Sequence, residues 1–432
     1  MIKTFIQNQL FKKARRYILK YNPRVVAITG SVGKTSTREA IALVLKSRFK
    51  VRTAKENYNN EFGVPLTILG KESPGRSWIG WIRLLCSHPS SNPEIIVLEF
   101  GADHPGDIAK LCMLVSPQVG VLTAISPVHL ENYASIESLI EEKSTLIRMT
   151  SPSGLVVLNA DDARVLEQKE NTSARVETYG FSKQALIRGS AYTLKTRLDD
   201  SFEPGENFSE LSFHAHLLKD EANIVLPNVL GRQQVSAALA ALCVGSYFGI
   251  PLDEMVTSLR NYKLQNGRLR PLAGIKGTLI LDDTYNAAPA SMIAALEVLR
   301  DFEPLNNNRR IAVLGNMAEL GAVSSEEHRH VGLRVAELGI DLLVCVGEKA
   351  QEIGQAAKEG MMEEERILYF SEISEAGHYL DHAIKQGDII LIKGSQSMRM
   401  EKIVKEIMAE PLKASELLVR QYGKWLEYEQ TS

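Results

Sequence analysis

The residues best suited to chemistry form a short glycine-rich segment near the N-terminus, Gly30-Ser31-Val32-Gly33-Lys34-Thr35-Ser36. An apolar stretch at 25–29 precedes it, and a helical pattern begins at Lys34. Such glycines free backbone N–H groups to surround phosphate oxygens, while the following helix offers its positive end. Lys34 would neutralise β- and γ-phosphates, and Thr35 would place its hydroxyl on Mg²⁺. Ile28 stands where the general pattern has its first glycine, so the segment predicts a shorter phosphate loop rather than a fortuitous turn.

Three further polar positions follow apolar runs of strand length. Glu99 ends the run at 95–98, and its carboxylate would suit Mg²⁺ together with the Thr35 hydroxyl. His129 follows the run at 119–123; a lone histidine is more often structural than metal-bound, so its residue type alone leaves both interpretations open. The pair Asp282-Asp283 ends a later run, where polar positioning is favoured over acid–base catalysis.

The elements that position these residues follow an alternating pattern. Apolar runs at 25–29, 95–98, 119–123 and 155–158 alternate with helical segments, which predicts an α/β domain with a mostly parallel sheet. Between about 172 and 226 the pattern shifts to alternation, as in Leu211, Phe213 and Ala215, which predicts a small antiparallel patch. Helices are expected from 232 to 260.

A second α/β domain is expected after a polar hinge at 266–271. Strand patterns restart at 278–282, 311–314, 342–346 and 389–392, which predicts a Rossmann-like C-terminal domain. The expected organisation is an N-terminal helix at 1–23, a central ATP-binding domain at 24–265 and a C-terminal domain at 266–432.

The N-terminal segment has the pattern of a basic amphipathic helix. Residues 1–24 carry seven Lys or Arg and no acid, and an apolar or alanine residue recurs every fourth position from Ile2 to Ile18. Such a helix either lies on an anionic membrane surface or packs on the following domain. The aromatic segment at 77–85 allows a second membrane or partner contact, but helical core packing is favoured there.

Composition excludes several classes of protein. The chain has 432 residues, 44% hydrophobic, with 50 basic against 52 acidic side chains, so nothing chain-wide predicts a nucleic-acid partner. No apolar run approaches the roughly 18 residues of a membrane span. The four cysteines show neither metal-ligand spacing nor a disulfide framework. A multidomain, monomeric protein of the reducing cytoplasm, without a leader segment, is therefore expected.

Several long motifs occur in an order that resembles the Mur ligase family, the ATP-dependent ligases that add amino acids or dipeptides to the peptidoglycan precursor. The similarity runs from Arg24 to about Val404 and is closest to the branch that adds D-alanyl-D-alanine. Besides the phosphate loop, its motifs are Asn57–Thr67, Glu99–Ile108, Pro127–Glu131, Asp282–Met292, Leu314–Gly321, His328 and Lys393–Met398.

The resemblance implies a role for each matching residue. ATP would be bound by Gly30, Ser31, Val32, Gly33, Lys34, Thr35, Ser36, Gln233, Arg268, Tyr285 and Asn286. Two Mg²⁺ ions would be held by Thr35, Glu99, His129 and Lys143. The catalytic set would be Lys34, Lys143, His129 and Arg268, and the substrates would meet Asn59, Asn60, Asn316, Glu319, Lys393 and Ser395.

Two of these assignments have alternatives. Lys143 aligns with the family lysine that CO₂ carbamylates, and the other interpretation is an ordinary exposed helix lysine beside Glu141 and Glu142. Arg268 is similar to the arginine that reaches ATP phosphate when the last domain closes, although Arg270 is close enough to compete for that role.

The sequence departs from the family pattern twice. Only 29 residues precede Gly30, so the family's first domain, which holds the UDP end of the acceptor, is expected to be missing. This puts in doubt how a UDP-linked substrate is held. Gln233 stands within Gly231–Val235, in the place of a Gly-x-His-Asn motif that frames the adenine, and glutamine can still hydrogen-bond there.

The function expected from this resemblance is addition of D-alanyl-D-alanine to a muramoyl-tripeptide acceptor through an acyl phosphate. One alternative is a similar ligase for a non-UDP acid, as in folylpolyglutamate synthase, or for another peptide. The other is a nucleotide-binding protein without turnover, which is disfavoured because Lys34, Thr35, Glu99, His129 and Lys143 are all retained.

Overall fold

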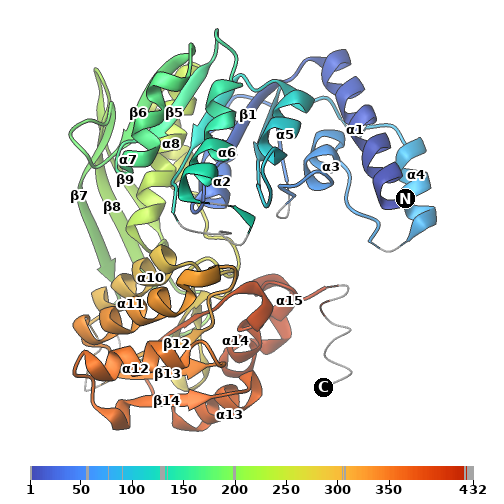
Figure 1. The fold of residues 1–432 in the computed structure, drawn as a ribbon. Helices are drawn as coiled ribbons and strands as arrows, with labels where there is room; N and C mark the ends of the chain where they lie inside the picture. The colour runs from blue at the N-terminus through green and yellow to red at the C-terminus, as the bar shows by residue number, and fades with distance from the viewer. Residues whose placement is uncertain are drawn as a thin grey trace. The chain divides into compact units, whose positions relative to one another are not determined.

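The computed structural model describes residues 2–54, 58–75, 77–89, 91–126, 132–133, 135–197, 201–303, 305, 308–422 and 425. Within them the chain forms two compact units. The first comprises Met1–Tyr192, Phe213–Val225 and Gln233–Tyr262, and the second comprises Thr193–Ser212, Leu226–Arg232 and Lys263–Ser432. Figure 1 shows the elements of both units in chain order.

A nine-stranded sheet runs through the described part of the chain up to residue 227. In spatial order its strands are β2 (Val51–Thr53), β3 (Ile95–Glu99), β1 (Arg24–Thr29), β4 (Val119–Leu122), β5 (Leu155–Asn159), β6 (Arg175–Gly180), β7 (Ile187–Thr196), β8 (Ser209–His216) and β9 (Glu221–Pro227). β1 pairs in parallel with β3 and β4, so the strand leading into the phosphate loop lies inside the sheet. Its residues after Arg24 are all buried, as a strand covered on both faces requires.

Helices cover this sheet and connect its strands. They are α1 (Ile2–Tyr21), α2 (Lys34–Leu45), α3 (Gly63–Leu69), α4 (Trp78–Cys86), α5 (Asp107–Val115), α6 (Ile136–Arg148), α7 (Ala163–Leu166), α8 (Arg232–Tyr247) and α9 (Leu252–Leu259). Apolar side chains of β1, β3, α3 and α5 form one continuous core cluster. The predicted parallel sheet with intervening helices is therefore confirmed.

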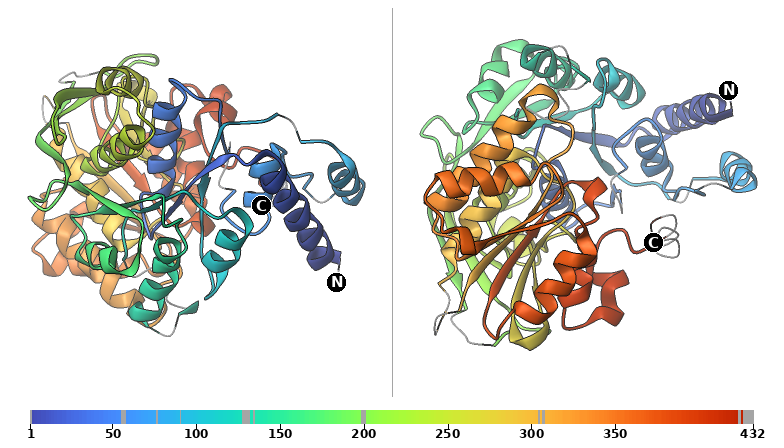
Figure 2. Two further views of the ribbon diagram at one scale, coloured as in Figure 1. Left: turned by 90° about the horizontal axis from the view of Figure 1, so that it is seen from above. Right: turned by 60° about the horizontal axis from the view of Figure 1, so that its bottom comes forward.

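The N-terminal helix α1 packs against α3, α4 and α5 (Figures 1 and 2). Its inner stripe, Leu10, Ala14, Tyr17 and Ile18, is buried in the same core cluster, as the packing interpretation predicts. The outer side keeps Lys3, Lys12, Arg16 and Lys20 exposed. None of the described helices is both long and apolar enough to cross a membrane.

The expectation that the segment at 77–85 packs into the core is only half right. It forms α4, which Ser77 begins by accepting a hydrogen bond from the Gly80 backbone at 3.0 Å. Leu84 is buried, whereas Trp78 is 67% exposed and Ile79 and Ile82 are about half exposed. The helix is too short and too apolar for a single core-facing stripe to absorb all its side chains.

Alternating polarity between 172 and 226 produces the predicted antiparallel patch only from β7 onward. β6 pairs in parallel with both β5 and β7, so the parallel pairing extends as far as β7 and the antiparallel patch consists of β7, β8 and β9. In β8 the residues Leu211, Phe213 and Ala215 are buried, while their neighbours point away from the core. This alternation leaves β8 with one polar face.

The second unit contains a six-stranded sheet among the described residues, with α10 (Pro289–Asp301), α11 (Ser324–Glu337), α12 (Gln351–Glu359), α13 (Ile373–Ala383), α14 (Glu401–Ile407) and α15 (Ala414–Leu417). The strand order is β10 (Arg270–Ala273), β11 (Leu279–Asp283), β15 (Ile389–Lys393), β12 (Arg310–Gly315), β13 (Leu342–Val346) and β14 (Ile367–Phe370). Among the described residues, the strands of this sheet pair in parallel except β10 with β11. The expected Rossmann-like α/β architecture is confirmed.

Candidate active site

The phosphate loop links the end of β1 to the start of α2. Gly30 (φ 146°) and Gly33 (φ 84°) both have positive φ values that favour glycine. A Cβ added to Gly30 would lie 2.1 Å from the Thr123 hydroxyl oxygen. That hydroxyl donates to the Val32 carbonyl at 2.6 Å, so the residue after β4 fixes the loop. Glycine at position 30 is thus a steric requirement of this loop.

Polar contacts hold the loop against the chain that follows β4. The Ser31 amide donates to the Ala124 carbonyl at 2.7 Å, and the Ser31 hydroxyl donates to the Ser126 carbonyl at 2.9 Å. The Lys34 ammonium donates to the carbonyl oxygens of Gly30 (2.7 Å) and Ser31 (3.2 Å). Ser36 lies in the first turn of α2. The loop therefore brings the Lys34 ammonium and the N-terminus of α2 next to its own backbone amides, an arrangement that suits a phosphate group.

The predicted Mg²⁺ ligands Thr35 and Glu99 lie together and are buried. The Thr35 hydroxyl donates to Glu99 Oε2 at 3.0 Å, and the Asn59 amide donates to Glu99 Oε1 at 3.2 Å. Two neighbouring ligands of an octahedral Mg²⁺ at roughly 2.05 Å lie about 2.9 Å apart, so the hydroxyl and the carboxylate fit that ion. Arg38, only 1% exposed, approaches the same Oε2 at 3.5 Å and fixes the carboxylate from α2.

Lys143 is not the exposed helix lysine that one interpretation allowed. It projects from α6 and is 2% exposed. Burial, together with the smaller effect of the nearby positive charge of Lys34, lowers its pKa from 10.5 to about 7, against the opposite effect of Glu142 and Asp103. At neutral pH a large fraction of this side chain is therefore a neutral amine beside the phosphate loop.

Glu142, the neighbour of Lys143, anchors the next helix. Its two carboxylate oxygens accept hydrogen bonds from the backbone amides of Gly106 and Ile108, each at 2.7 Å. These amides belong to the first turn of α5, where a negative charge is favoured by the helix dipole. The two adjacent residues thus have different functions: Glu142 caps α5, and Lys143 approaches the phosphate loop.

The remaining predicted residues of the first unit are placed as follows. His129 lies outside the described residues, so its metal role stays a prediction. Asn60 accepts bonds from the Phe62 and Gly63 amides, at 3.1 and 2.9 Å, and thereby caps α3. Gln233 is exposed in the first turn of α8, whereas its neighbour Gln234 is buried and accepts a bond from the Tyr262 hydroxyl at 2.8 Å. Of these two glutamines, Gln233 is the exposed one, and its contact with a nucleotide stays a prediction.

In the second unit a buried carboxylate shapes the loop after β11. Asp282 accepts hydrogen bonds from the Thr284 hydroxyl at 2.6 Å and from the Gly267 amide at 3.1 Å. Burial raises the pKa of Asp282 to about 6, and the Thr284 bonds oppose this rise. The carboxylate therefore joins the β11 loop to the segment at 266–269, and its positioning role beside a nucleotide stays a prediction.

Tyr285 has two arginine guanidinium groups close to its ring. The Arg268 guanidinium is 4.1 Å from the centre of its ring and that of Arg420 is 5.5 Å away. Arg420 also donates to the Tyr285 carbonyl and to the Thr284 carbonyl, the latter at 3.2 Å. Arg270 instead donates to the Asn266 side chain and, at 3.4 Å, to the carbonyl of Leu417. Of the two candidate arginines, Arg268 is the one that contacts Tyr285.

A second polar group gathers where three parallel strands end. Lys393, buried at the end of β15, forms an ion pair with Asp283 at 2.7 Å and donates to the carbonyl of the exposed Asn286 at 2.8 Å. Burial lowers the Lys393 pKa, and Asp283 opposes that effect. The Ser395 amide donates to the Asn316 carbonyl at 3.0 Å, so Asn316 and Ser395 adjoin the same edge.

His328 holds the loop after β12 in place through hydrogen bonds. His328 Nδ1 contacts the Ser324 carbonyl at 2.6 Å, and Nε2 accepts from the Met317 amide at 2.9 Å. The Ser395 hydroxyl accepts from the Ala318 amide at 2.7 Å. Glu319 is exposed on this loop with a φ of 62°, a value uncommon outside glycine. His328 and Ser395 therefore shape the loop that presents Glu319.

Sequence reasoning did not assign roles to Thr123, Arg38, Glu142 and Arg420. Glu142 stands beside Lys143, and Arg38 lies one helical turn after Lys34, so spacing alone could have identified these two. Thr123 and Arg420 act on residues distant in the sequence, and no local pattern reveals them.

A glycine-rich loop between a buried parallel strand and a helix, with a buried hydroxyl and carboxylate at a separation that fits Mg²⁺, is typical of P-loop nucleotide-binding α/β proteins. The chain belongs to the Mur ligase family: residues 28–245 match the Mur ligase middle domain, and residues 267–396 match the Mur ligase glutamate ligase domain.

Individual relatives show the branch of the family. The chain is 30% identical over 396 residues to the UDP-N-acetylmuramoyl-tripeptide–D-alanyl-D-alanine ligase of Haemophilus influenzae, covering 89% of this chain and 77% of that protein. It is 28% identical over 399 residues to the Bacillus subtilis ligase of the same name, covering 92% and 79%. The crystal structure of MurF ligase from Thermotoga maritima in complex with ADP has a TM-score of 0.76 and 26% identity, covering 93% of this chain and 83% of that one.

Proposed function

We propose that this protein is an ATP-dependent ligase that joins D-alanyl-D-alanine to the peptide carboxylate of a UDP-muramoyl-tripeptide, releasing ADP and phosphate. The observation that carries the proposal is the buried Thr35–Glu99 pair beside the phosphate loop, in a chain similar along most of its length to ligases named for that reaction. The pair provides what phosphoryl transfer needs, a cation site next to a phosphate cradle.

In the first step an acceptor carboxylate oxygen attacks the γ-phosphorus of ATP, the bond to the β–γ bridging oxygen breaks, and ADP leaves. We assign the Lys34 ammonium to the phosphate oxygens, where negative charge accumulates; its contact with the phosphate loop supports this assignment. Thr35 and Glu99 would hold the Mg²⁺, which when bound neutralises phosphate charge. Arg38 and Asn59 keep the Glu99 carboxylate oriented.

In the second step the amine of D-alanyl-D-alanine attacks the acyl carbon, and phosphate leaves as the C–N bond forms. The strand-end group of the second unit, with Asn316, Glu319, Lys393 and Ser395, has the polarity that an amino acid or dipeptide requires. We assign Arg268, Tyr285 and Asn286 to the nucleotide, because the Arg268–Tyr285 stack offers a flat cationic surface.

We further propose that Lys143 is carbamylated. Its neutral amine would attack CO₂, forming an N–C bond and releasing one proton, and the product would be a carbamate anion. The low pKa supports this step, because only the unprotonated amine is nucleophilic. The anion would face Lys34 and would complete, with His129, a second Mg²⁺ site. ¹³C NMR of protein equilibrated with ¹³C-bicarbonate should show a carbamate signal that disappears in Lys143→Ala; a signal that persists in this variant contradicts the proposal.

The assay of the ligase reaction measures phosphate release from ATP and Mg²⁺ with UDP-muramoyl-tripeptide and D-alanyl-D-alanine, each also omitted in turn. Release that needs both substrates and is lost in Lys34→Ala supports the proposal. Lys46→Ala is the matched control, because Lys46 is exposed at the other end of α2. Release only with another acid would reassign the acceptor, and nucleotide binding without release would leave a non-catalytic protein.

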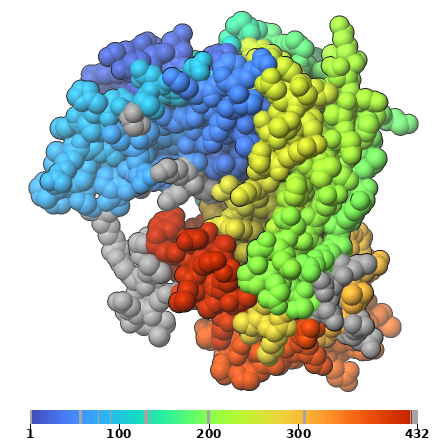
Figure 3. Space-filling view, turned by 180° about the vertical axis from the view of Figure 1, so that it is seen from behind, coloured from blue at the N-terminus to red at the C-terminus, as the bar shows by residue number. Residues whose placement is uncertain are grey.

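A peripheral membrane contact is proposed for α1 and α4. The exposed Trp78, Ile79 and Ile82 share one side of α4, and the exposed side of the neighbouring α1 is basic. Lys13 of α1 donates to the carbonyls of Leu84 and Leu85 and so fastens the two helices together. In Figure 3 the lighter blue atoms of the segment around residue 80 stand at the edge of the first unit. Apolar anchors beside basic side chains suit an anionic lipid surface.

A further inference from the structure

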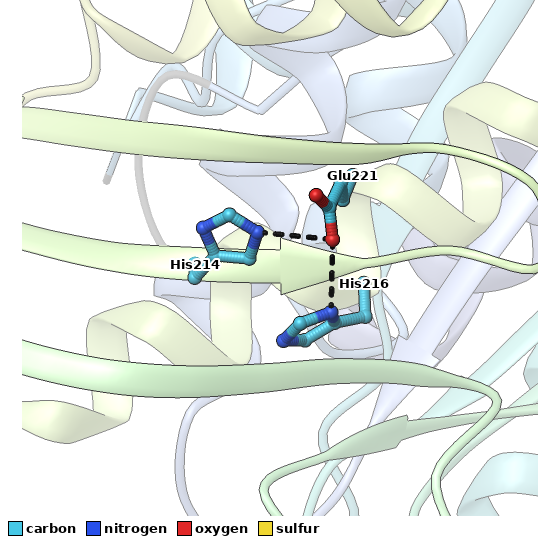
Figure 4. Close-up of side chains that lie close together, drawn as sticks. All are labelled: His214, His216 and Glu221. Atoms are coloured by element: carbon cyan, nitrogen blue, oxygen red, sulfur yellow. Dashed lines mark ion pairs between the residues drawn. The ribbon is translucent and has the colours of Figure 1, made fainter.

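Two histidines and a glutamate converge on the polar face of the antiparallel patch, on residues that the proposed ligase site does not use. His214 and His216 alternate along β8 and therefore point to the same side, opposite the buried Phe213 and Ala215. Glu221 begins β9 across the hairpin. Backbone bonds from Asn228 to Ser209 (2.7 Å) and from Leu217 to Asp220 (2.8 Å) set a register that places Glu221 opposite His216. Figure 4 shows the three side chains facing one another.

The distances suit a common cation. Glu221 Oε2 lies 3.4 Å from His214 Nε2 and 3.5 Å from His216 Nδ1. In tetrahedral coordination with bonds of roughly 2.05 Å, neighbouring ligand atoms are about 3.3 Å apart. The three ligand atoms all lie within 4.8 Å of one another, so a small rotation of one imidazole completes the arrangement.

A further contact selects the ligating nitrogen of His216. Its Nε2 lies 2.7 Å from the hydroxyl oxygen of Ser190, on β7. When Nε2–H donates to this hydroxyl, Nδ1 carries the lone pair and faces Glu221. Metal-binding histidines characteristically use their second nitrogen in this way, because the bond fixes both the tautomer and the ring orientation. Three adjacent strands therefore contribute to the arrangement.

We infer that His214, His216 and Glu221 form a binding site for a divalent transition metal, with Zn²⁺ as its best match. Two imidazoles and one carboxylate favour Zn²⁺, Ni²⁺ or Cu²⁺ over Mg²⁺ and Ca²⁺, which prefer oxygen ligands. Three protein ligands leave a fourth position for water or for a group from another molecule. A bound ion would link the ends of β8 and β9 and stabilise the hairpin.

The test is a Zn²⁺ titration of the full chain, free of any histidine tag, by calorimetry in buffer with millimolar Mg²⁺ to fill oxygen-ligand sites. We expect one Zn²⁺ per chain, and a higher unfolding temperature with Zn²⁺ than without. His214→Ala and Glu221→Gln should each weaken binding at least tenfold. Ser190→Ala, a positioning variant, should weaken it about tenfold. Glu221 is exposed, so its variant keeps the test valid if the histidine variant does not fold.

The matched control is the double variant His378→Ala, His382→Ala. It removes an adjacent imidazole pair elsewhere, on α13, whose ring centres lie 4.8 Å apart. This variant should retain the Zn²⁺ stoichiometry and affinity of the unmodified chain. Absence of Zn²⁺ binding up to millimolar concentration, or unchanged binding in Glu221→Gln and His214→Ala, would overturn the inference.

Discussion

At the scale of single residues, Lys143 shows how burial changes the chemistry of a side chain. An exposed lysine is a cation at neutral pH, whereas Lys143, with its pKa near 7, is partly a neutral nucleophile. This chemistry has a thermodynamic cost, because the folded protein must hold an amine that the unfolded chain would protonate. Replacing a residue that is kept for function at the expense of stability should raise the free energy of unfolding.

Lys143→Met should therefore be more stable than the unmodified protein and inactive as a ligase. The folded-state pKa of Lys143 lies below its unfolded value of 10.5, so the destabilisation is complete below pH 7 and disappears as the pH rises toward 10.5. Its magnitude is roughly 3–5 kcal/mol at pH 7. Urea unfolding at pH 7 and pH 10, in CO₂-free buffer, should show a gain for the variant that shrinks at the higher pH.

The control for this comparison is Lys46→Met, which changes an exposed lysine of α2. It should shift the free energy of unfolding by less than about 0.5 kcal/mol at either pH. A Lys143→Met protein that is less stable than the unmodified protein at pH 7 would show that the amine is charged and paired in the folded state.

Two substitutions of Glu99 should differ in their effects on stability and on activity. Glu99→Ala would remove the carboxylate beside the buried Arg38 and should destabilise the fold by about 3 kcal/mol, although Glu39 still pairs with Arg38 at 2.6 Å. Glu99→Gln keeps the size of the side chain and an oxygen that can accept from Thr35. It should retain most of the stability yet reduce acceptor-dependent phosphate release at least 100-fold.

Calorimetry and the phosphate-release assay on the same preparations separate the two effects. Near-normal turnover in Glu99→Gln would remove Glu99 from the metal site. Equal unfolding temperatures for the alanine variant and the unmodified protein would show that Arg38 does not depend on this carboxylate.

At the scale of elements, the sequence predicted long apolar strands well and short or partly exposed ones poorly. β1, β3, β4 and β5 are buried runs with a clear signal. β2 is half-buried and only three residues long, β14 is buried at only one position, and β10 contains a proline. Such segments become strands because a neighbouring strand pairs with them. The local sequence pattern does not show which strand will lie beside them, so it does not predict them.

The same reasoning explains which site residues could be predicted. The phosphate loop is one contiguous segment, so its chemistry is visible in the sequence. The burial of Lys143 depends on packing around α6, and the contact of Arg420 with Tyr285 joins positions 135 residues apart. The exposure of Trp78 could not be predicted either. An apolar helical segment favours core packing, and only the surrounding elements determine which of its side chains are covered.

Gly30→Ala should disable the phosphate loop. The new methyl group would lie 2.1 Å from the Thr123 oxygen, and residue 30 would keep a φ that alanine strains to adopt. The loop must shift, so nucleotide affinity measured by calorimetry with a nonhydrolysable ATP analogue should fall at least tenfold. Gly249→Ala is the control, since position 249 also has a positive φ but nothing lies within 4 Å of its Cβ. Equal affinity in both variants would contradict this account.

The exposed side of α4 should bind anionic vesicles. Burying a large apolar side chain is worth roughly 1.5–3 kcal/mol, and each nearby basic residue adds about 1 kcal/mol at an anionic surface. Replacing Trp78, Ile79 and Ile82 together with serine should lower sedimentation with phosphatidylglycerol vesicles at least tenfold. Leu218→Ser, which replaces an exposed apolar side chain outside α4, should not lower it. Equal sedimentation of all three proteins, or binding to neutral vesicles alone, would reject the membrane contact.

At the scale of the whole molecule, nucleotide should make the protein more compact. In the proposed ligase, phosphate binds Lys34 of the first unit, and the base and ribose bind Tyr285 and Asn286 of the second unit. Small-angle scattering should give a smaller radius of gyration with a nonhydrolysable ATP analogue than without it. Arg268→Ala should reduce the change, whereas Arg270→Lys should preserve it. An unchanged radius at saturating nucleotide would reject domain closure.

The contact between Arg420 and the β11 loop has a practical consequence for handling the protein. Arg420 is buried, pairs with Glu401 at 2.7 Å and bonds to the carbonyls of Thr284 and Tyr285, yet it lies beyond residue 396, where the family match ends. A protein trimmed to the matched region would lose this support while keeping every residue assigned here to ATP, Mg²⁺ or substrate. A shortened protein should therefore extend at least through Trp425, whose ring lies 5.9 Å from the Arg420 guanidinium. An affinity tag for assays is better placed at the N-terminus, and its effect on vesicle binding should be checked separately.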